Sequence, residues 1–296
     1  MIVTVTLNPS LHVQYDAEQV EVGAENRVSG VRYNTGGRGL AVARLLHTFG
    51  HDVVATGLAG GSTGELIRTE LARAGVAARF TRISAESRRV VRVTDVVAGH
   101  STIFAEPAPY ITTEELGRLA ADYRVLLDGA TAVVLCGSLP AGLPAEIYGS
   151  LTSYATGAGV PVILDAGGSA LRHGVARGPA LVIPEPDGSD EGLEAAGASS
   201  VVLPAHHGVR ALTPAGEWRA EVRPRGRTGT DQAATGFRDA LVAGFVPGIA
   251  LAWSWPDMLR HAVALAASVT PGGEADLTAY ELLLPEVAVT GPAGAG

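Results

Sequence analysis

The sequence contains no lysine, and all 22 of its basic residues are arginines. Roles that proteins often give to lysine, such as a point contact to a phosphate group, must therefore be filled by arginine or be absent, because the two side chains are not equivalent. The formal net charge is −8, so no basic excess favours general binding to nucleic acid. We expect no nucleic-acid partner.

Cysteine and long apolar runs are also scarce. Cys136 is the single cysteine, which excludes a disulfide within the chain and argues against a cysteine-based metal site. No apolar run reaches the roughly 18 to 20 residues that span a bilayer. The opening MIVTVTLNPS lacks the basic and apolar regions of a signal peptide. We therefore expect a cytoplasmic protein that does not associate with membranes.

What is present is an alternation of helical and apolar strand patterns, in a chain of 296 residues of which 47% are hydrophobic. This alternation predicts an α/β fold with a mostly parallel sheet. For the helix predicted over 62–75, Ser62 or Thr63 is the expected N-cap. Apolar strands are predicted at 1–7, 51–60, 131–137, 161–167, 179–184 and 199–205, and helices at 38–50, 62–75, 113–129 and 144–159.

Two segments, 11–34 and 80–106, do not follow this alternation. They contain alternating, β-branched stretches such as FTRI (80–83), RVVRVTDV (89–96) and STIFAE (101–106). We expect them to form a small separate sheet or flap. Residues 1–290 are interpreted as one domain that includes these segments, and 291–296 as a disordered tail.

Three glycine-containing loops are candidates for a ligand site. TGGRGLAVAR (35–44) and GFRD (236–239) each precede a helix, and CGSLPAGLP (136–144) follows a buried strand. Backbone N–H groups at a helix start favour anions, and loops at the carboxyl ends of parallel strands are where open α/β sheets bind ligands. By its position, Asp239 in the GFRD loop is either a helix cap or a catalytic base.

Seven segments match one known pattern in order and spacing from residue 1 to about 250. VTLNPSLHVQY is similar to TLNPALDxTY, NTGGRGLAVARLL to DPGGKGINVARVL, ESRRVVRV to ETRTNVKI, TIFAEPAPYIT to TEINEPGPxIS, LCGSLPAGLP to LSGSLPPGLP, ILDAGGSALR to LLDTSGEALR, and TGFRDALVAGF to VGAGDSFVAGF. The chain thus resembles the PfkB-type carbohydrate kinases, and most closely the 1-phosphofructokinase and tagatose-6-phosphate kinase branch. The resemblance implies a ribokinase-like three-layer αβα fold with a small β-sheet lid, and a homodimer formed through that lid.

For catalysis, the resemblance implies that Asp239 takes the proton from the sugar hydroxyl as this hydroxyl attacks the γ-phosphate of ATP. Gly236 and Arg238 belong with it to a turn whose backbone N–H groups surround the transferring phosphoryl group. Mg²⁺ would bridge the nucleotide phosphates, and no protein metal ligand is assigned. Residues 236–239 would thus form the catalytic turn of the kinase.

Substrate and nucleotide contacts are implied by the same resemblance. Arg88 is expected to hold the phosphate that the sugar already carries, assisted by Arg38, and a guanidinium suits that role. The implied substrate-binding residues are His12, Gly36, Gly37, Arg38, Gly39, Arg88 and Ser138. The implied nucleotide-binding residues are Phe237, Glu185, Ala205 and Gly208.

Several residues differ in chemistry from the family pattern. His12 stands in place of an aspartate that binds sugar hydroxyls, and Ala41 in place of an asparagine. Phe237 and Arg238 replace alanine and glycine, and Arg238 would be strained by roughly 1 kcal/mol if its φ were positive. The charge of Arg238 would partly replace a lysine that the segment LVIPEPDGSDEG (181–192) lacks. On the lid, polar family residues are replaced by Val90, Ile103 and Ala105.

Within 181–192, two alignments with the metal-linked NxxE motif remain open. An ungapped match uses Glu185 and Gly188, and a shifted match offers Asp187 and Asp190. Two functional hypotheses follow from these comparisons. In the first, the chain is an ATP-dependent phosphotransferase acting on a sugar phosphate, similar to a 1-phosphofructokinase. In the second, it is a catalytically impaired paralogue that binds a phosphorylated metabolite or a partner protein without efficient phosphoryl transfer.

Overall fold

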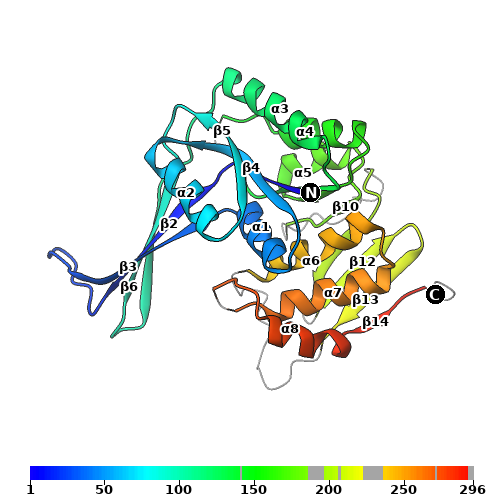
Figure 1. Ribbon diagram of the computed structural model, residues 1–296. Helices are drawn as coiled ribbons and strands as arrows, with labels where there is room; N and C mark the ends of the chain where they lie inside the picture. Colours follow the sequence, from blue (N-terminus) through cyan, green and yellow to red (C-terminus); the bar gives the residue numbers. More distant parts are fainter. Residues whose placement is uncertain (141, 186–196, 206–207, 223–235, 271, 293–296) are drawn as a thin grey trace.

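The computed structural model describes residues 1–140, 142–185, 197–205, 208–222, 236–270 and 272–292. The described residues form a large sheet covered by helices on both faces and a second, smaller sheet at one side (Figure 1). No helix in these ranges is long and apolar enough to cross a membrane.

The large sheet has the strand order β14-β13-β12-β11-β10-β9-β8-β1-β4-β5. The strands from β11 to β5 pair in parallel, and only β11 to β14 pair antiparallel. This confirms the predicted mostly parallel sheet. The strands are β1 (Ile2–Thr6), β4 (Val53–Gly60), β5 (Ala77–Ile83), β8 (Ala132–Cys136), β9 (Val162–Asp165), β10 (Leu181–Val182), β11 (Val201–Ala205), β12 (Gly208–Thr213), β13 (Gly216–Glu221) and β14 (Ala288–Thr290).

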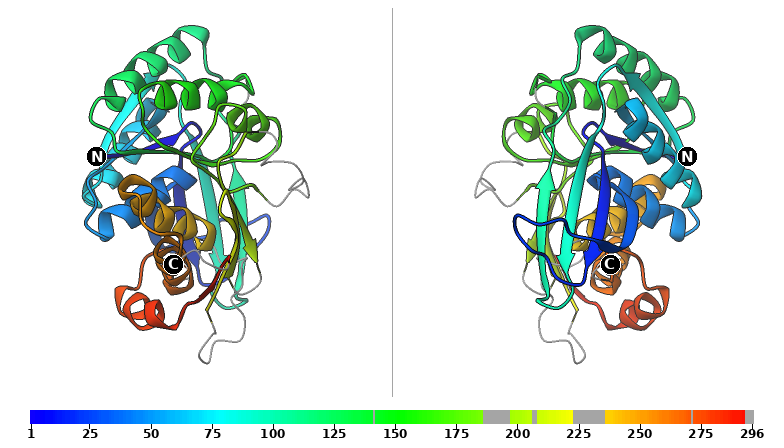
Figure 2. Two further views of the ribbon diagram at one scale, coloured as in Figure 1. Left: turned by 90° about the vertical axis from the view of Figure 1, so that its right-hand side faces the viewer. Right: turned by 90° about the vertical axis from the view of Figure 1, so that its left-hand side faces the viewer.

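Both faces of the sheet are buried, which explains why its strands are continuously apolar. Along β8, Val134 and Cys136 belong to a core cluster with α1, α6 and α7, whereas Val133 and Leu135 belong to a second cluster with α3, α4 and α5. The three layers of the predicted αβα fold are visible in Figures 1 and 2. The helices are α1 (Arg38–Thr48), α2 (Gly61–Arg73), α3 (Thr113–Leu127), α4 (Ile147–Gly157), α5 (Gly168–Val175), α6 (Phe237–Leu251), α7 (Trp255–Ser268), α8 (Leu277–Leu283) and the 3-10 turn η1 (Leu284–Glu286).

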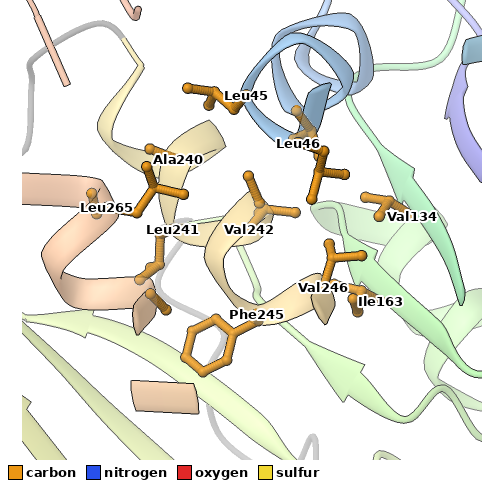
Figure 3. Packing of buried hydrophobic residues seen from close by; sticks show 14 of the residues in the cluster. Leu45, Leu46, Val134, Ile163, Ala240, Leu241, Val242, Phe245, Val246 and Leu265 are labelled. Atoms are coloured by element: carbon orange, nitrogen blue, oxygen red, sulfur yellow. The ribbon is translucent and has the colours of Figure 1, made fainter. Parts of the chain in front are cut away.

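Helix α6 lies at the centre of the first cluster. In Figure 3, Leu241, Val242, Phe245 and Val246 point from α6 toward α1, the sheet and α7. A helix that is apolar on nearly all sides must be buried in this way. Its packing holds the N-terminus of α6, with Asp239 in the first turn, in a fixed position relative to the sheet.

The second sheet has the order β3-β2-β6-β7 and extends away from the body of the molecule (Figure 1). It consists of β2 (Ser10–Ala17), β3 (Val28–Gly36), β6 (Arg88–Asp95) and β7 (His100–Ala105), and we call it the lid sheet. The prediction that FTRI (80–83) belongs to it is wrong. These residues lie in β5, which pairs in parallel with β4 at the edge of the large sheet, because the chain returns to that sheet after α2.

The predicted N-cap of α2 is also wrong. The helix begins at Gly61, so Ser62 and Thr63 lie inside its first turn, and Gly60 is the N-cap without a side-chain hydrogen bond. The carboxylate of Glu86 takes over that function, because it accepts hydrogen bonds from the backbone N–H groups of Ser62 and Thr63. A carboxylate suits this position because the first N–H groups of a helix have no partner within it.

Candidate active site

A cavity of about 330 Å³ lies at the carboxyl ends of the parallel strands. Strands β1 and β8 are neighbours there, and their onward connections lead to opposite sides of the sheet, which is the usual ligand position in such folds. The three predicted glycine loops meet in this cavity. Its lining includes Gly36, Gly37, Arg38, Gly137, Ser138, Gly236 and Asp239 from the loops, and Ser10, His12, Asn34 and Arg88 from the lid sheet.

The glycine loop before α1 is packed tightly against the lid sheet. A Cβ atom at Gly36 would lie 2.2 Å from Nε2 of His12 and 2.4 Å from the hydroxyl of Ser10. Gly37 is the N-cap of α1, and no side chain caps that helix. Gly39 follows inside the first turn. Gly36 therefore brings the backbone close to the lid sheet, and Gly37 and Gly39 bring it close to the end of β1 at Thr6. The helix start is left open for a ligand.

The start of α6 is open in the same way. Gly236 has φ 104°, no side chain caps the helix, and a Cβ atom at this position would lie 2.6 Å from Cα of Gly273. The backbone N–H groups of the first turn are thus available to an anion at this end of the helix.

The two large residues of this turn leave the cavity free. Phe237 is buried in the core cluster, and Arg238 points toward Asp165. Among the described residues that line the cavity, Gly236 and Asp239 are present but the two residues between them are not. Arg238 is inside α6, and in the described ranges Ala252 is the single non-glycine residue with a positive φ, so the strain considered for Arg238 is absent.

Asp239 is a poorly hydrated carboxylate, with 18% of its side chain exposed. Its pKa is raised to about 6, mainly by burial; Asp165 acts in the same direction, and the positive charges of Arg38 and Arg44 act in the opposite direction. Nε of Arg38 lies 3.5 Å from Oδ1 of Asp239. Because a base works best when its pKa lies near the working pH, this carboxylate is suited to accept a proton.

Arg38 is held by carboxylates. It donates hydrogen bonds to Asp165 and, at 2.5 Å, to Oε1 of Glu185. Burial alone would lower the pKa of Arg38, but Asp165, Asp239 and Glu185 more than compensate and raise it. Arg38 and Arg88 both line the cavity, Arg38 beside Asp239 and Arg88 on the lid side. The phosphate clamp formed by these two arginines stays a prediction.

Arg238 is the second cation on Asp165. Its Nη2 also donates a hydrogen bond to the backbone carbonyl of Ile183 at 2.7 Å. The fully buried Asp165 thus has two guanidinium partners. The positive charge of Arg238 thus lies beside Ile183, and its replacement of the lysine that segment 181–192 lacks stays a prediction.

On the lid side, Arg88 is connected to the GSLP loop by a chain of hydrogen bonds. Nε of Arg88 donates to Oδ1 of Asn8 at 3.1 Å, and Nδ2 of Asn8 donates to the hydroxyl of Ser138 at 3.4 Å. The hydroxyls of Thr6 and Ser10, which also line the cavity, are buried without a partner among the described residues. Unpaired buried hydroxyls are costly, so the lining favours a polar ligand.

Two of the expected nucleotide contacts are strand residues. Ala205 ends β11 and Gly208 begins β12. Neither lines this cavity, and their contact with a nucleotide stays a prediction. A Cβ atom at Gly208 would lie 1.9 Å from the carbonyl oxygen of Ala220, so strand pairing explains this glycine. Glu185 contacts Arg38. The alternatives Asp187, Gly188 and Asp190 lie outside the described residues.

Three residues of the site were missed from the sequence. Asp165 ends an apolar strand, and a charge at the carboxyl end of a parallel strand was an available signal. Arg44 interrupts the apolar stretch of α1, and Nη1 of Arg44 donates to the carbonyl of Thr35 at 3.0 Å. Asn8 had no signal of its own, because its role depends on contact with Arg88 and Ser138.

The described carboxylates do not fit a magnesium ion held by the protein. Asp165 and Glu185 are paired with arginines, and no group of three His, Cys, Asp or Glu side chains in the described ranges is arranged to hold a metal. Because Mg²⁺ is usually bound through one or two carboxylates together with substrate phosphates, the phosphates would have to supply most of its ligands here.

A doubly covered, mostly parallel sheet with a lid and a polar cavity at its switch point is typical of small-molecule enzymes. The model of the pfkB family of carbohydrate kinases matches residues 10–215. The chain belongs to this family.

Solved structures from bacteria have the same fold. A phosphofructokinase-2 from Escherichia coli is 25% identical, with 96% of this chain and 98% of that chain covered and a TM-score of 0.83. A Staphylococcus aureus protein assigned provisionally as a phosphofructokinase is 23% identical, with 99% of both chains covered and a TM-score of 0.86. A Thermotoga maritima protein assigned provisionally as a 1-phosphofructokinase is 24% identical, with the same coverage and a TM-score of 0.83. The similarities to the Staphylococcus aureus and Thermotoga maritima proteins show only that the fold is shared.

Proposed function

We propose that this protein transfers the γ-phosphoryl group of ATP to a hydroxyl group of a sugar phosphate, with Asp239 as the general base. One observation carries the proposal. Asp239, whose pKa is raised to about 6, lies in the cavity beside the uncapped N-terminus of α6. A proton acceptor and a set of anion-binding N–H groups at one place are the two requirements of phosphoryl transfer to an alcohol.

The remaining residues support this role by binding and orientation. Arg88, fixed by Asn8, is positioned to bind the phosphate that the substrate already carries. Arg38, 3.5 Å from Asp239, is positioned to face the negative charge of the transferring group. A bound ATP·Mg²⁺ would supply the phosphoryl group. Water must be kept away from Asp239, and the lid sheet contributes residues to that side of the cavity. An Escherichia coli phosphofructokinase-2 of the same fold is described in complex with fructose-6-phosphate.

A second candidate function is binding of a phosphorylated metabolite without efficient transfer. It is favoured by the contacts of Arg38, which has carboxylates of Asp165, Glu185 and Asp239 around it. A γ-phosphate must compete with these carboxylates for the guanidinium. If Arg38 does not exchange partners, the phosphate lacks this cation and transfer is slow.

A turnover assay distinguishes the two functions. Wild type and Asp239→Asn are compared with ATP·Mg²⁺ and fructose 1-phosphate, fructose 6-phosphate or tagatose 6-phosphate. Asp257→Asn is the matched control, because Asp257 lies in the first turn of α7 and is exposed. Turnover that is lost in Asp239→Asn and kept in Asp257→Asn supports the kinase. Stabilisation by sugar phosphate without turnover supports the binding protein, and turnover that survives Asp239→Asn contradicts the role of Asp239.

The lid sheet also supports a homodimer. Tyr33 and Phe104 lie on one of its faces, because both register with the central pair Val13 and Val91, and they are 50% and 60% exposed. Large exposed apolar side chains gathered on one face are typical of protein interfaces. A second copy of the lid, with the same apolar residues, is a self-complementary partner for such a face.

A further inference from the structure

The cavity continues beneath the lid into a second space of about 690 Å³. Six residues line both spaces, among them His12, Asn34 and Arg44. The second space therefore lies beside the candidate sugar-phosphate site. A substrate that fills both would be longer, or would carry more groups, than one held in the first cavity alone.

Three arginines surround the junction of the two spaces. Arg88 lines the first cavity, Arg92 the second, and Arg44 both. Along β6, residues 88, 90 and 92 point to the same face of the lid sheet because side chains alternate along a strand. His12 on β2 is paired with Val90 in the register. Arg44 reaches the junction from α1.

These three arginines form no ion pair with a carboxylate of the described residues, unlike two other arginines that line the second space. Arg32 is paired with Asp16, and Arg73 with Glu70. The pKa of Arg44 is lowered, because burial has a larger effect than the carboxylates of Asp239 and Glu274, which both act to raise it. The pKa of His12 is also lowered, first by burial and then by Arg88, Arg44 and Arg92.

Arg44 and Arg88 are partly buried, and Arg92 is exposed. Positive charges gathered around one space repel one another, and the partly buried ones lose hydration, so an anion bound between them would be stabilised. One phosphate on Arg88 leaves Arg92 without an ion-pair partner among the described residues, and leaves Arg44 with only the more distant carboxylates of Asp239 and Glu274. Ala41 and Val90, which line the first and the second space, offer no polar group to a sugar hydroxyl. The charges and the shape of the joined spaces thus favour a ligand with two separated anionic groups.

We propose that the substrate is a sugar phosphate that carries a second anionic group, either the carboxylate of a sugar acid or another phosphate, bound by Arg44 and Arg92 beside His12. The proposal rests on the proposed function to the extent that the first anion is the phosphate bound by Arg88. It narrows the substrate class from hexose monophosphates to doubly anionic sugar phosphates.

Binding measured by calorimetry without nucleotide tests this proposal with matched ligand pairs. The first pair, 6-phosphogluconate and glucitol 6-phosphate, differs by a carboxylate. The second pair, fructose 1,6-bisphosphate and fructose 6-phosphate, differs by a phosphate. We expect the doubly anionic member of at least one pair to bind at least tenfold more tightly to the wild type, and the pair that shows this identifies the second anion.

Variants of the lid strand make the test specific. Arg92→Gln should abolish the preference and leave binding of the singly charged ligands within about twofold, and Arg92→Glu should reverse the preference because like charges repel. Arg89→Gln is the control, since Arg89 is paired with Glu106 and lies on the opposite face of the same strand. Thermal unfolding shows that each variant is folded.

Equal binding within both pairs, no binding of any of the four ligands, or a preference that persists in Arg92→Gln overturns the proposal. Because nucleotide is absent, these results do not depend on phosphoryl transfer. A protein that shows the preference and no turnover retains this inference and loses the kinase function. A protein that turns over substrate and shows no preference retains the kinase function and loses this inference.

Discussion

Nε and Nη2 of Arg238 lie 2.9 and 2.6 Å from Oδ1 of Asp165, a carboxylate with no exposed surface. Arg38 binds the other oxygen of the same carboxylate. Two guanidinium groups thus face one buried carboxylate, which leaves one positive charge in excess. Arg38, which carries part of this excess, also lies beside Asp239. The large side chain of Arg238 therefore does not fill the cavity. It lies outside the cavity lining and stabilises the buried carboxylate of Asp165.

Arg238→Ala should strongly destabilise the fold. The substitution leaves the buried carboxylate of Asp165 with Arg38 as one of its two cations, and the lost charge-assisted hydrogen bonds should lower the free energy of unfolding by about 1.5 to 3 kcal/mol. Urea denaturation measures this loss. Arg89→Ala, which removes an exposed pair with Glu106, should cost much less. An equal effect of the two substitutions would show that Asp165 does not depend on Arg238.

Asp239→Asn should stabilise the folded protein while it removes activity. The pKa of Asp239 rises from 3.8 to about 6 on folding, so the native state binds more protons and the wild type loses stability as the pH rises from about 4 to about 6. Asparagine does not ionise. At pH 8 we expect the variant to be more stable by up to about 3 kcal/mol, and below about pH 4 the difference should vanish. Thermal unfolding at several pH values provides the comparison.

The activity of the wild type should fall as the pH drops through about 6, because the base must be deprotonated. Arg38→Gln removes a charge that lowers the pKa of Asp239, so the acidic limb of the profile of kcat against pH should move to higher pH. Arg260→Gln on the exposed part of α7 should leave the profile unchanged. If Arg38→Gln lowers kcat without moving the acidic limb, its charge does not act on this carboxylate.

Gly236→Ala should destabilise the protein and reduce turnover. The added Cβ atom would meet Cα of Gly273 at 2.6 Å, and φ at this position is 104°, which costs more than about 1 kcal/mol in a residue other than glycine. Gly117→Ala is the control. Gly117 lies inside α3 with open space around it, so alanine should stabilise that helix. The free energy of unfolding and the turnover rate are measured for both variants. If Gly236→Ala changes neither quantity, the close approach of Gly236 to Gly273 at the N-terminus of α6 is contradicted.

If the protein forms a dimer through the lid sheet, a charged substitution in that interface should lower its molecular mass in solution. Phe104→Asp places a charge on the exposed apolar face and should convert dimers to monomers in analytical ultracentrifugation. Val97→Asp is the control, because Val97 is exposed but follows the end of β6. A wild type that is monomeric at all concentrations, or a Phe104→Asp variant that stays dimeric, contradicts this interface.

Strand and helix alternation could be predicted from the sequence because it depends on local apolar patterns. The exceptions were decided by longer-range contacts. FTRI (80–83) has the composition of a lid strand but pairs with β4. The N-terminus of α2 is capped by Glu86, a residue 23 positions from Thr63. Neither partner could be recognised from the pattern around it.

The sequence by itself determined the order of the elements, the glycine loops that precede α1 and α6, and the place of Asp239 in a first helical turn. These are local properties of the chain. The tertiary structure decided which charges meet: Arg38 contacts Asp165 over 127 positions and Glu185 over 147, and Arg238 contacts Asp165 over 73. Such contacts depend on how α1, α6 and the sheet pack together. For the same reason, only the fold placed Arg44, Arg88 and Arg92 around His12.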